Sequence, residues 1–520
     1  MLRLTPKSAG AVVLVSVSAV GLASDLGEWW LPRASLAELS AVTARDAVGA
    51  LQVSVHAEGA GVRLRLARAP VPPLTLSFER ATTPGVVELD PNRLVAAGAA
   101  LFAVPLAWRL RPVPTRLEIV AKKLYAEGRG ASALGVGDLR ELEVSGDALG
   151  RTTVLAGQLG HAVLDGPEGH DEMAWLGYTS FDPRSVAAEV AAFRSAVRDY
   201  FGEKRSAPCT LLLTTDARPA GSFDVTRQTA SVLATVGVSQ TYNGPLRVAV
   251  AHQLLREWIG PVLHVGDAAR PAESLWFVEG LSRFLARELT FRFGLLAPVE
   301  YLAEVDEIER LVLTSPDAAR GNAELASRAT EPAVAALLVA RGARHATSVD
   351  AAIRRKSGGK RSLDGVLRAL YAEALRAQGP LPESAWGAAL ERELGAEGAL
   401  LHREEVATGR PRPLPNDALG PCFIAGPRRF ESLALGFEAS GEPPVVARVT
   451  PGSPAERAGL RVGDGVGSLP HASTPAVPVR LEIERAGQKQ RIEFRPVGAL
   501  VPGRGFTRVA RVPDERCARR

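Results

Sequence analysis

The sequence is poor in cysteine, with only Cys209, Cys422 and Cys517 among 520 residues. These cysteines lie far apart and show none of the short paired spacings of a cysteine-ligated metal site. One disulfide at most can form among them, which leaves at least one thiol over. The cysteine content therefore excludes a disulfide-stapled scaffold and gives no indication of a cysteine metal centre.

The sequence also lacks a basic stripe with interleaved aromatic residues. The net charge is +5 and the pI is about 9.3, but arginine is scattered among acidic residues along the whole chain. We therefore expect no nucleic-acid partner. A hydrophobic share of 46% with 23% charged residues is typical of a globular protein, not of a disordered or multi-span membrane protein. The length predicts several domains.

The N-terminus has the pattern of an export signal. Arg3 and Lys7 precede an apolar run, Ala9–Val20, which is too short to span a bilayer and is followed by the small residues of Gly21–Ala23. We expect residues 1–23 to be a signal peptide, which implies a periplasmic or extracellular protein with no membrane span after cleavage. An uncleaved N-terminal anchor is the alternative. The absence of cysteine near Ala23 argues against a lipoprotein.

Hydrophobic periodicity divides the rest of the chain. Alternating runs such as Val62–Leu66 predict strands, and Ala297–Ala407 has helical periodicity. We expect a multidomain α+β protein with a β-sandwich at 24–181, an α+β domain at 182–296, an α-helical domain at 297–408, a linker at 409–429, a β domain at 430–498 and a tail at 499–520. Within the helical part, an acidic cluster is interpreted as a solvated helix face, namely Glu304, Asp306, Glu307 and Glu309.

One expected helix, Pro245–Ile259, carries His252-Gln253-Leu254-Leu255-Arg256. This stretch reads like the motif His-Glu-x-x-His, in which two histidines hold Zn²⁺ and the glutamate is the general base. Gln253 stands at the general-base position and cannot accept a proton at ordinary pH. Arg256 brings a permanent positive charge where a neutral imidazole would donate a lone pair.

The C-terminal β domain resembles a bacterial PDZ domain through the run Pro451–Asp464. Leu435, Gly436 and Phe437 correspond to the loop that binds a peptide's C-terminal carboxylate. The short, proline-containing segment 465–478 opposes the usual helix, so the groove lacks its outer wall. Whether this groove captures a C-terminal peptide is left open.

Together, the β-sandwich, the two helices and the PDZ-like run resemble the glycyl aminopeptidase family of gluzincin metallopeptidases. The resemblance implies a thermolysin-like middle region in which Glu279, on a second expected helix at Ser274–Phe293, would be the third zinc ligand. The family's substrate-binding loop corresponds at best to Ala220–Asp224, which lacks the glutamate expected to bind a substrate's α-amine. Tyr242 and Tyr301 are candidates for the oxyanion-stabilising tyrosine.

The altered motif predicts a degenerate metal site with no metal and no cofactor. A carboxylate without its metal requires a cation, so we expect Arg256 to pair with Glu279; in the alternative, both side chains point to solvent. His264 or Asp267 could supply a rescue ligand. We therefore expect a non-catalytic, exported, peptidase-like protein that binds a peptide or protein. The alternative is an active zinc aminopeptidase with a non-standard ligand set.

Overall fold

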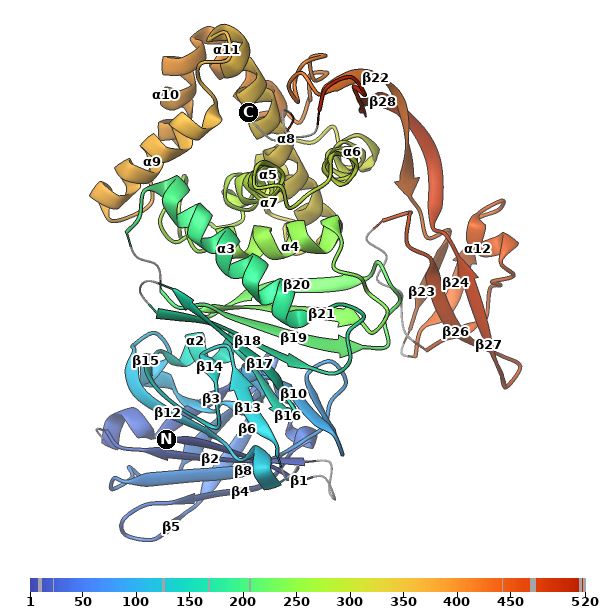
Figure 1. Ribbon diagram of the computed structural model, residues 1–520. Helices are drawn as coiled ribbons and strands as arrows, with labels where there is room; N and C mark the ends of the chain where they lie inside the picture. The colour runs from blue at the N-terminus through green and yellow to red at the C-terminus, as the bar shows by residue number, and fades with distance from the viewer. Residues whose placement is uncertain are drawn as a thin grey trace. The chain divides into compact units, whose positions relative to one another are not determined.

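The computed structural model describes residues 1–7, 12–21, 23–123, 127–166, 169–204, 207–441, 443–467, 474–513 and 517. The chain divides into two compact units, Met1–Tyr242 and Asn243–Arg520. The first unit is rich in strands and the second combines a helical part with a smaller C-terminal β part (Figure 1). The multidomain α+β class expected from the sequence is confirmed.

The described residues in the first half of unit one form three sheets. A seven-stranded sheet has the order β15 (Leu139–Val144), β12 (Val113–Ile119), β1 (Leu2–Lys7), β2 (Val12–Ala19), β8 (Leu74–Ala81), β4 (Leu39–Arg45), β5 (Ala50–Leu51). A five-stranded sheet has the order β14 (Gly135–Val136), β13 (Arg129–Ser132), β16 (Thr153–Gly157), β10 (Arg93–Ala97), β9 (Val87–Asp90). A four-stranded sheet has the order β11 (Val104–Pro105), β3 (Glu28–Leu31), β7 (Gly61–Leu66), β6 (Val53–Glu58). Two short helices lie among them, α1 (Gly98–Leu101) and α2 (Gly146–Gly150).

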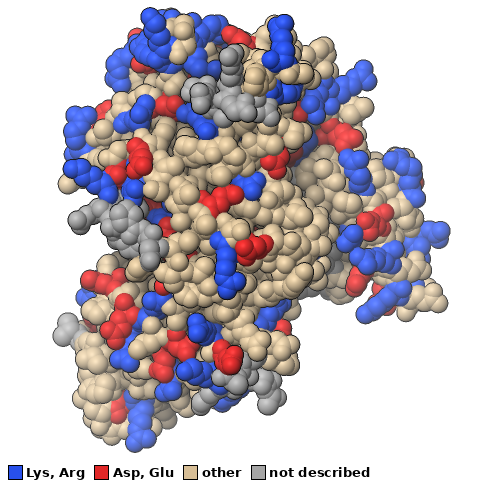
Figure 2. Space-filling model, in the orientation of Figure 1, with Lys and Arg blue, Asp and Glu red and all other residues tan. Residues whose placement is uncertain are grey.

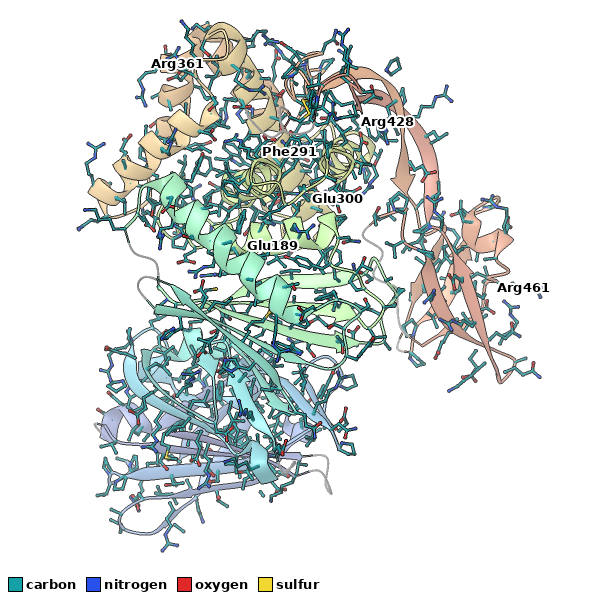
Figure 3. The ribbon with its side chains drawn as sticks, in the orientation of Figure 1. Glu189, Phe291, Glu300, Arg361, Arg428 and Arg461 are labelled. Carbon is teal, nitrogen blue, oxygen red and sulfur yellow. A yellow bond between two sulfur atoms is a disulfide. The ribbon has the colours of Figure 1, made fainter. Side chains whose placement is uncertain are left out.

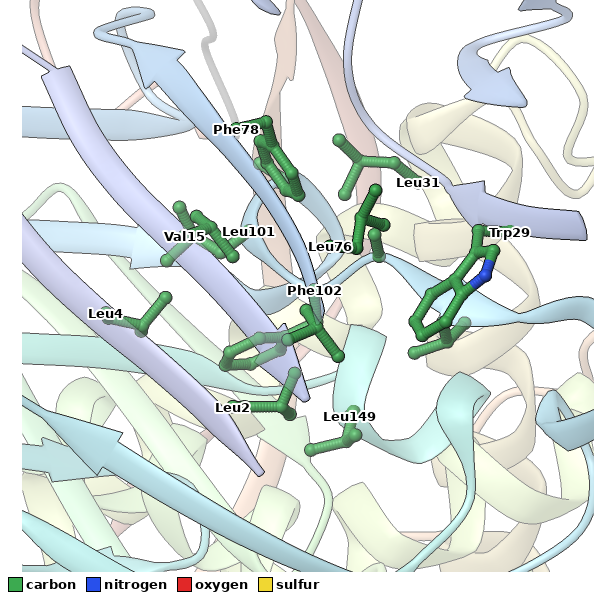
Figure 4. Close-up of a cluster of buried hydrophobic side chains, with 14 of the residues drawn as sticks. Leu2, Leu4, Val15, Trp29, Leu31, Leu76, Phe78, Leu101, Phe102 and Leu149 are labelled. Carbon is green, nitrogen blue, oxygen red and sulfur yellow. The ribbon is translucent and has the colours of Figure 1, made fainter. Parts of the chain in front are cut away.

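The residues expected to form a signal peptide are built into the seven-stranded sheet. Strand β2 alternates between buried and half-buried residues along its whole length, and β1 pairs with both β2 and β12. Leu2, Leu4 and Val15 point into the core of these sheets (Figure 4). The boundary expected at residue 23 is therefore wrong, because a short alternating strand shares its composition with a signal's apolar region. Residues 8–11 and 22 lie outside the described residues.

The remaining described strands of unit one form a fourth sheet. Its order is β17 (Gly160–Gly166), β18 (Gly169–Leu176), β19 (Thr210–Asp216), β21 (Ser231–Gly237), β20 (Phe223–Gln228). Strands β18 and β19 are parallel and are joined through helix α3 (Pro183–Phe201), as parallel neighbours require a crossover. The β-sandwich expected at 24–181 therefore extends too far, since β17 and β18 belong to this mixed sheet.

Unit two begins with closely packed helices. They are α4 (Gly244–Leu255), α5 (Leu275–Arg292), α6 (Pro298–Thr314), α7 (Asn322–Ala326), α8 (Pro332–Lys356), α9 (Leu363–Ala377), α10 (Glu383–Leu394) and α11 (Ala396–His402), followed by a π-helical turn, Arg403–Ala407. Helices α5 and α8 cross where Gly280 meets Gly342. A Cβ on Gly342 would lie 1.7 Å from the carbonyl oxygen of Trp276, so this crossing requires glycine. Gly280, which directly follows Glu279, therefore has a packing role.

The acidic cluster on α6 is not a solvated face, contrary to the expectation. Glu309 is 4% exposed, and its carboxylate lies 2.7 Å from Arg344 on α8. Asp306 lies 2.7 Å from Arg428, which is labelled on β22 in Figure 3. The sequence shows the acids but not the arginines that face them, because those arginines lie on elements that are distant in sequence.

Asp306 predicts a specific pH dependence of stability. Burial raises its pKa from 3.8 to about 6, although the charge of Arg428 opposes the shift. The folded protein thus binds this proton more tightly than the unfolded chain, so Asp306 reduces stability as pH rises from about 4 through about 6. Asp306→Asn should raise the free energy of unfolding by about 1–3 kcal/mol at pH 7.5. Urea denaturation at several pH values measures this difference.

The gain from Asp306→Asn should shrink toward zero below about pH 3, where the wild-type carboxyl is largely protonated in both states. Asp199→Asn is a control, because the Asp199 side chain is 70% exposed and should show little change at any pH. A destabilised Asp306→Asn variant at pH 7.5 would instead show that the ion pair with Arg428 outweighs the burial of the carboxylate.

The C-terminal part of the chain packs against the helices of unit two. Strand β22 (Phe423–Leu433) pairs along its length with β28 (Val497–Arg508), and a disulfide joins Cys422 to Cys517. Leu414 is buried, and the carbonyl of Arg412 accepts a hydrogen bond from Arg344 at 2.5 Å. The expected linker at 409–429 and tail at 499–520 are therefore corrected, because both pack against folded elements.

A five-stranded sheet lies between β22 and β28 in the chain. Its order is β23 (Phe437–Ser440), β24 (Val445–Val449), β25 (Gly465–Val466), β26 (Val479–Arg485), β27 (Gln488–Phe494), with helix α12 (Pro454–Arg457) after β24. Strand β23 pairs only with β24 among the described residues, so it is an edge strand. The proline-containing segment where the sequence predicts a missing helix lies partly outside the described residues, at 468–473.

Candidate functional site

Two helices of unit two position the altered motif. Helix α4 begins at its N-cap Asn243, whose side chain accepts a hydrogen bond from the amide of Leu246. It ends at Leu255, with Arg256 at the C-cap, so it is shorter than the expected helix at 245–259. Helix α5 carries Glu279. His252 therefore lies in the last turn of α4 and Arg256 directly follows it, both facing α5.

The three side chains form one connected cluster. The Nε of Arg256 lies 2.9 Å from Oε1 of Glu279, and the Nε2 of His252 lies 3.1 Å from Oε2. Arg256 also donates through Nη1 to the carbonyl of Ile259 at 2.6 Å. The ion pair expected between Arg256 and Glu279 is therefore confirmed. The arginine side chain is held at two points.

The hydrogen bonds of His252 determine which of its nitrogens bears a proton. Nε2 lies 3.1 Å from the backbone carbonyl of Glu279 as well as 3.1 Å from its carboxylate. Both partners are acceptors, so Nε2 must be the donor and carries hydrogen. A metal ligand needs the nitrogen lone pair instead. In this arrangement, Nε2 of His252 would have to lose its proton before it could coordinate a metal.

The cluster holds Glu279 as a carboxylate. Burial by itself would raise the pKa of Glu279, but the hydrogen bond from His252 and the charges of His252 and Arg256 together lower it below 4.5. The carboxylate is therefore ionised and neutralised by Arg256 at neutral pH. The site combines a fixed anion with a fixed cation, so it has no surplus negative charge with which to attract a metal ion.

Gly260 makes room for the guanidinium. Its φ is +111°, and a Cβ built on it would lie 2.3 Å from Nη1 of Arg256. Gly260→Ala should therefore destabilise the protein by about 1–3 kcal/mol, because the alanine is strained and displaces Arg256 from Glu279. Urea denaturation measures the loss.

Gly294→Ala is the matched control, since Gly294 also has a positive φ of +74° but nothing lies within 4 Å of its added Cβ. Gly294→Ala should lower the free energy of unfolding by about 1 kcal/mol, from backbone strain alone. Equal losses for the two variants would show that contact with Arg256 contributes nothing. The zinc-type motif did not predict the role of Gly260 in making room for Arg256. A glycine after the end of a helix is nevertheless a recognisable sequence signal for a positive φ.

The residues present do not fit a zinc ion. Among the described residues, no group of three or more His, Cys, Asp or Glu side chains is arranged to hold a metal. His264, one expected rescue ligand, has its Nε2 3.1 Å from the hydroxyl of Ser274, and burial lowers its pKa. Asp267, the other, pairs with Arg270 at 3.0 Å. Catalytic zinc requires three protein ligands and an open position, which this donor set does not supply.

The remaining candidates from the sequence are placed as follows. Gln253 lies half-buried on α4 beside His252. Tyr301 is fully buried and donates its hydroxyl to Glu288 at 2.6 Å, so it is a core residue and not an oxyanion donor. Tyr242 packs against Phe181 in unit one.

The expected substrate loop, Ala220–Asp224, also belongs to unit one. The amide of Gly221 donates to Gln240 at 2.7 Å, and Asp224 pairs with Arg218 at 2.8 Å. The one carboxylate of this loop is thus engaged within its own unit.

The loop expected to bind a carboxylate precedes edge strand β23. Leu435 and Phe437 pack into the core of the five-stranded sheet, and Gly436 has a φ of +79°. The carbonyl of Gly436 accepts a hydrogen bond from the amide of Thr450 at 2.8 Å. Alternate residues of the loop thus anchor it to the sheet.

The fold of this chain is similar to that of a solved aminopeptidase. The chain superimposes on an aminopeptidase N family protein from Idiomarina loihiensis with a TM-score of 0.72 and 16% identity, covering 96% of this chain and 97% of that one. Yeast LTA4 hydrolase in complex with bestatin gives a TM-score of 0.50 at 15% identity, covering 80% and 69% respectively. No protein-family model and no curated protein sequence matches the chain. The similarity to these two proteins is therefore one of fold.

Proposed function

We propose that this protein is a non-catalytic relative of the gluzincin peptidases in which an ion pair replaces the zinc ion. The observation that carries the proposal is the 2.9 Å contact between Arg256 and Glu279. The guanidinium supplies a positive charge to the carboxylate that would otherwise ligate zinc. The helix pair is thereby stable without a metal, and the protein needs no cofactor.

The chemistry of the site supports the same conclusion. Hydrolysis by this scaffold needs a general base beside the metal-bound water, and Gln253 has only an amide at that position. The Nε2 of His252 is used as a hydrogen-bond donor. His252 is thus not available as a metal ligand while its Nε2 carries the proton, and Gln253 cannot abstract a proton, so two separate requirements of hydrolysis are lost. This favours a role in binding over a role in hydrolysis.

The ligand we propose is a peptide or protein with a free C-terminus, bound at the PDZ-like sheet. Strand β23 presents an unpaired edge among the described residues, and an extended peptide can add to such an edge. Fluorescence anisotropy with a library of C-terminal hexapeptides tests this proposal. Binding that disappears when the C-terminus of the peptide is amidated would support recognition of the carboxylate by this loop. If no peptide binds, the proposal is contradicted.

We propose that the protein is exported, and the disulfide between Cys422 and Cys517 is the support for this. Such bonds form and persist in oxidising compartments and are rare in the cytosol. No helix in the described part of the chain is long and apolar enough to cross a membrane. Cell fractionation with thiol alkylation tests the proposal, which requires the protein outside the cytoplasm with only Cys209 alkylated after denaturation.

Metal analysis of the purified chain tests the loss of catalysis. The protein should be prepared without a polyhistidine tag and dialysed against a zinc-containing buffer, and its metal content measured by mass spectrometry. Hydrolysis should be assayed with aminoacyl p-nitroanilides as substrates. We expect far less than one zinc ion per chain and no hydrolysis above the blank. Near-stoichiometric zinc that is lost in His252→Ala, together with hydrolysis, would overturn the proposal and favour an active aminopeptidase with a non-standard ligand set.

A further inference from the structure

Unit one contains a cavity that the altered peptidase site does not use. Its volume is about 540 Å³, and its lining residues come from β10, β16, β19, β20, β21 and neighbouring loops. All of them lie within residues 33–235, so the cavity belongs to unit one alone. A volume of this size is typical of small-molecule sites.

The lining of the cavity contains polar atoms that the protein leaves unsatisfied. The hydroxyl of Thr214 and the Oε1 of Gln228 are buried and have no hydrogen-bond partner among the described residues. Gln228 donates through Nε2 to the hydroxyl of Thr153 at 2.6 Å, which leaves that hydroxyl its own proton to donate. Buried polar atoms in native proteins are normally paired, so these three groups indicate a polar occupant.

Two arginines at the cavity carry charge that no described carboxylate neutralises. Arg33 and Arg151 are exposed lining residues, and neither has an ion-pair partner among the described residues. Arg218 in the same lining differs, because Asp216 and Asp224 both lie 2.8 Å from it. Glu88, the remaining carboxylate of the lining, pairs with Arg93 at 3.7 Å, so the unpaired charge at the cavity is positive. It suits an anionic group on the occupant.

One part of the lining is apolar. Val95 and Ala97 on β10 and Leu233 on β21 contribute side chains without polar atoms. Such a surface suits the carbon skeleton of a small ring. The occupant should thus combine an anionic group, several hydroxyls and an apolar face.

We propose that this cavity binds a small polyhydroxylated anion of the sugar-acid class. Its carboxylate would pair with Arg33 and Arg151, and its hydroxyls would bond to Thr214, Gln228 and Thr153. A sugar phosphate shares the anionic and hydroxyl chemistry and would use the same groups. This binding is independent of the ion pair at Glu279 and of the PDZ-like sheet.

Isothermal titration calorimetry with the full chain tests the proposal, using glucuronate, glucose 6-phosphate, glucose, acetate and inorganic phosphate as probes. We expect glucuronate to bind and glucose and acetate to bind at least about tenfold more weakly, because each lacks one half of the recognised chemistry. Tighter binding of glucose 6-phosphate than of glucuronate would assign the anion as phosphate. If neither sugar anion binds, or if glucose binds as well as glucuronate, the proposal is overturned.

Three variants locate the binding. Arg151→Gln and Arg33→Gln should each weaken glucuronate binding about tenfold, while Arg45→Gln, which changes an exposed arginine of the same unit outside the cavity, should leave it unchanged. Thr214→Val keeps the side-chain shape and should weaken binding without lowering the melting temperature, since the hydroxyl has no protein partner. Unchanged binding in all three variants would place the sugar acid elsewhere and refute the assignment.

Discussion

Glu279→Ala should lower the free energy of unfolding by about 2–4 kcal/mol, because it leaves a guanidinium and an imidazole donor without their acceptor. The three side chains of the cluster are only 15–22% exposed, so solvent can replace the lost carboxylate only in part. Chemical denaturation followed by circular dichroism measures the loss. A melting curve that matches the wild type would show that the ion pair does not stabilise the protein.

Two comparisons make this experiment specific. Glu273→Ala removes a carboxylate that is 46% exposed and pairs with Arg270, and it should cost at most about 1 kcal/mol. Arg256→Ala combined with Glu279→Ala should cost less than the sum of the two single changes, because each change removes the same interaction. Additive costs would mean that the two residues act independently.

The loss in Glu279→Ala should also depend on pH. The folded-state pKa of Glu279 lies below its ordinary value, so its contribution is fully present above about pH 5 and is lost as pH falls through the folded-state pKa. The difference between wild type and variant should therefore narrow in acid. The Asp306 carboxylate makes a contribution of the opposite sign, because its raised pKa means that its ionisation reduces stability at neutral pH.

Gln253→Glu combined with Arg256→His should give a protein that binds about one zinc ion per chain. The double change adds the second histidine and the general base to His252 and Glu279, which the chain already has. It also removes the guanidinium cation of Arg256 from the position of the metal. Changes to groups that only support the ligands alter metal affinity by about 10–100-fold, so adding a direct ligand should exceed about a hundredfold. Competition with a chromogenic chelator measures the affinity.

Gln253→Glu alone is the control for the double variant. It restores the general base but keeps Arg256 against Glu279, so it should remain without zinc. If the double variant also fails to bind zinc while remaining folded, the metal site has changed at more than these two residues. Zinc binding without hydrolysis would locate the remaining defect outside the metal ligands and the general base.

The sequence by itself determined the local features of this protein. Helical periodicity places His252 and Arg256 four residues apart on one face, and charge balance pairs Arg256 with Glu279, as the structure confirms. These conclusions depend on spacing within one helix, on the family resemblance that singles out Glu279, and on the cost of an unpaired carboxylate. All three can be obtained from the sequence without the tertiary structure.

Tertiary structure alone decided which distant segments meet. Strand β1 pairs with β12 more than 100 residues away, so the residues interpreted as a leader form part of a sheet instead. The acids of α6 face arginines of α8 and β22, and Cys422 joins Cys517 across 95 residues. Composition and periodicity describe what a segment can bury, but the partner that buries it is fixed by contacts between residues far apart in the chain.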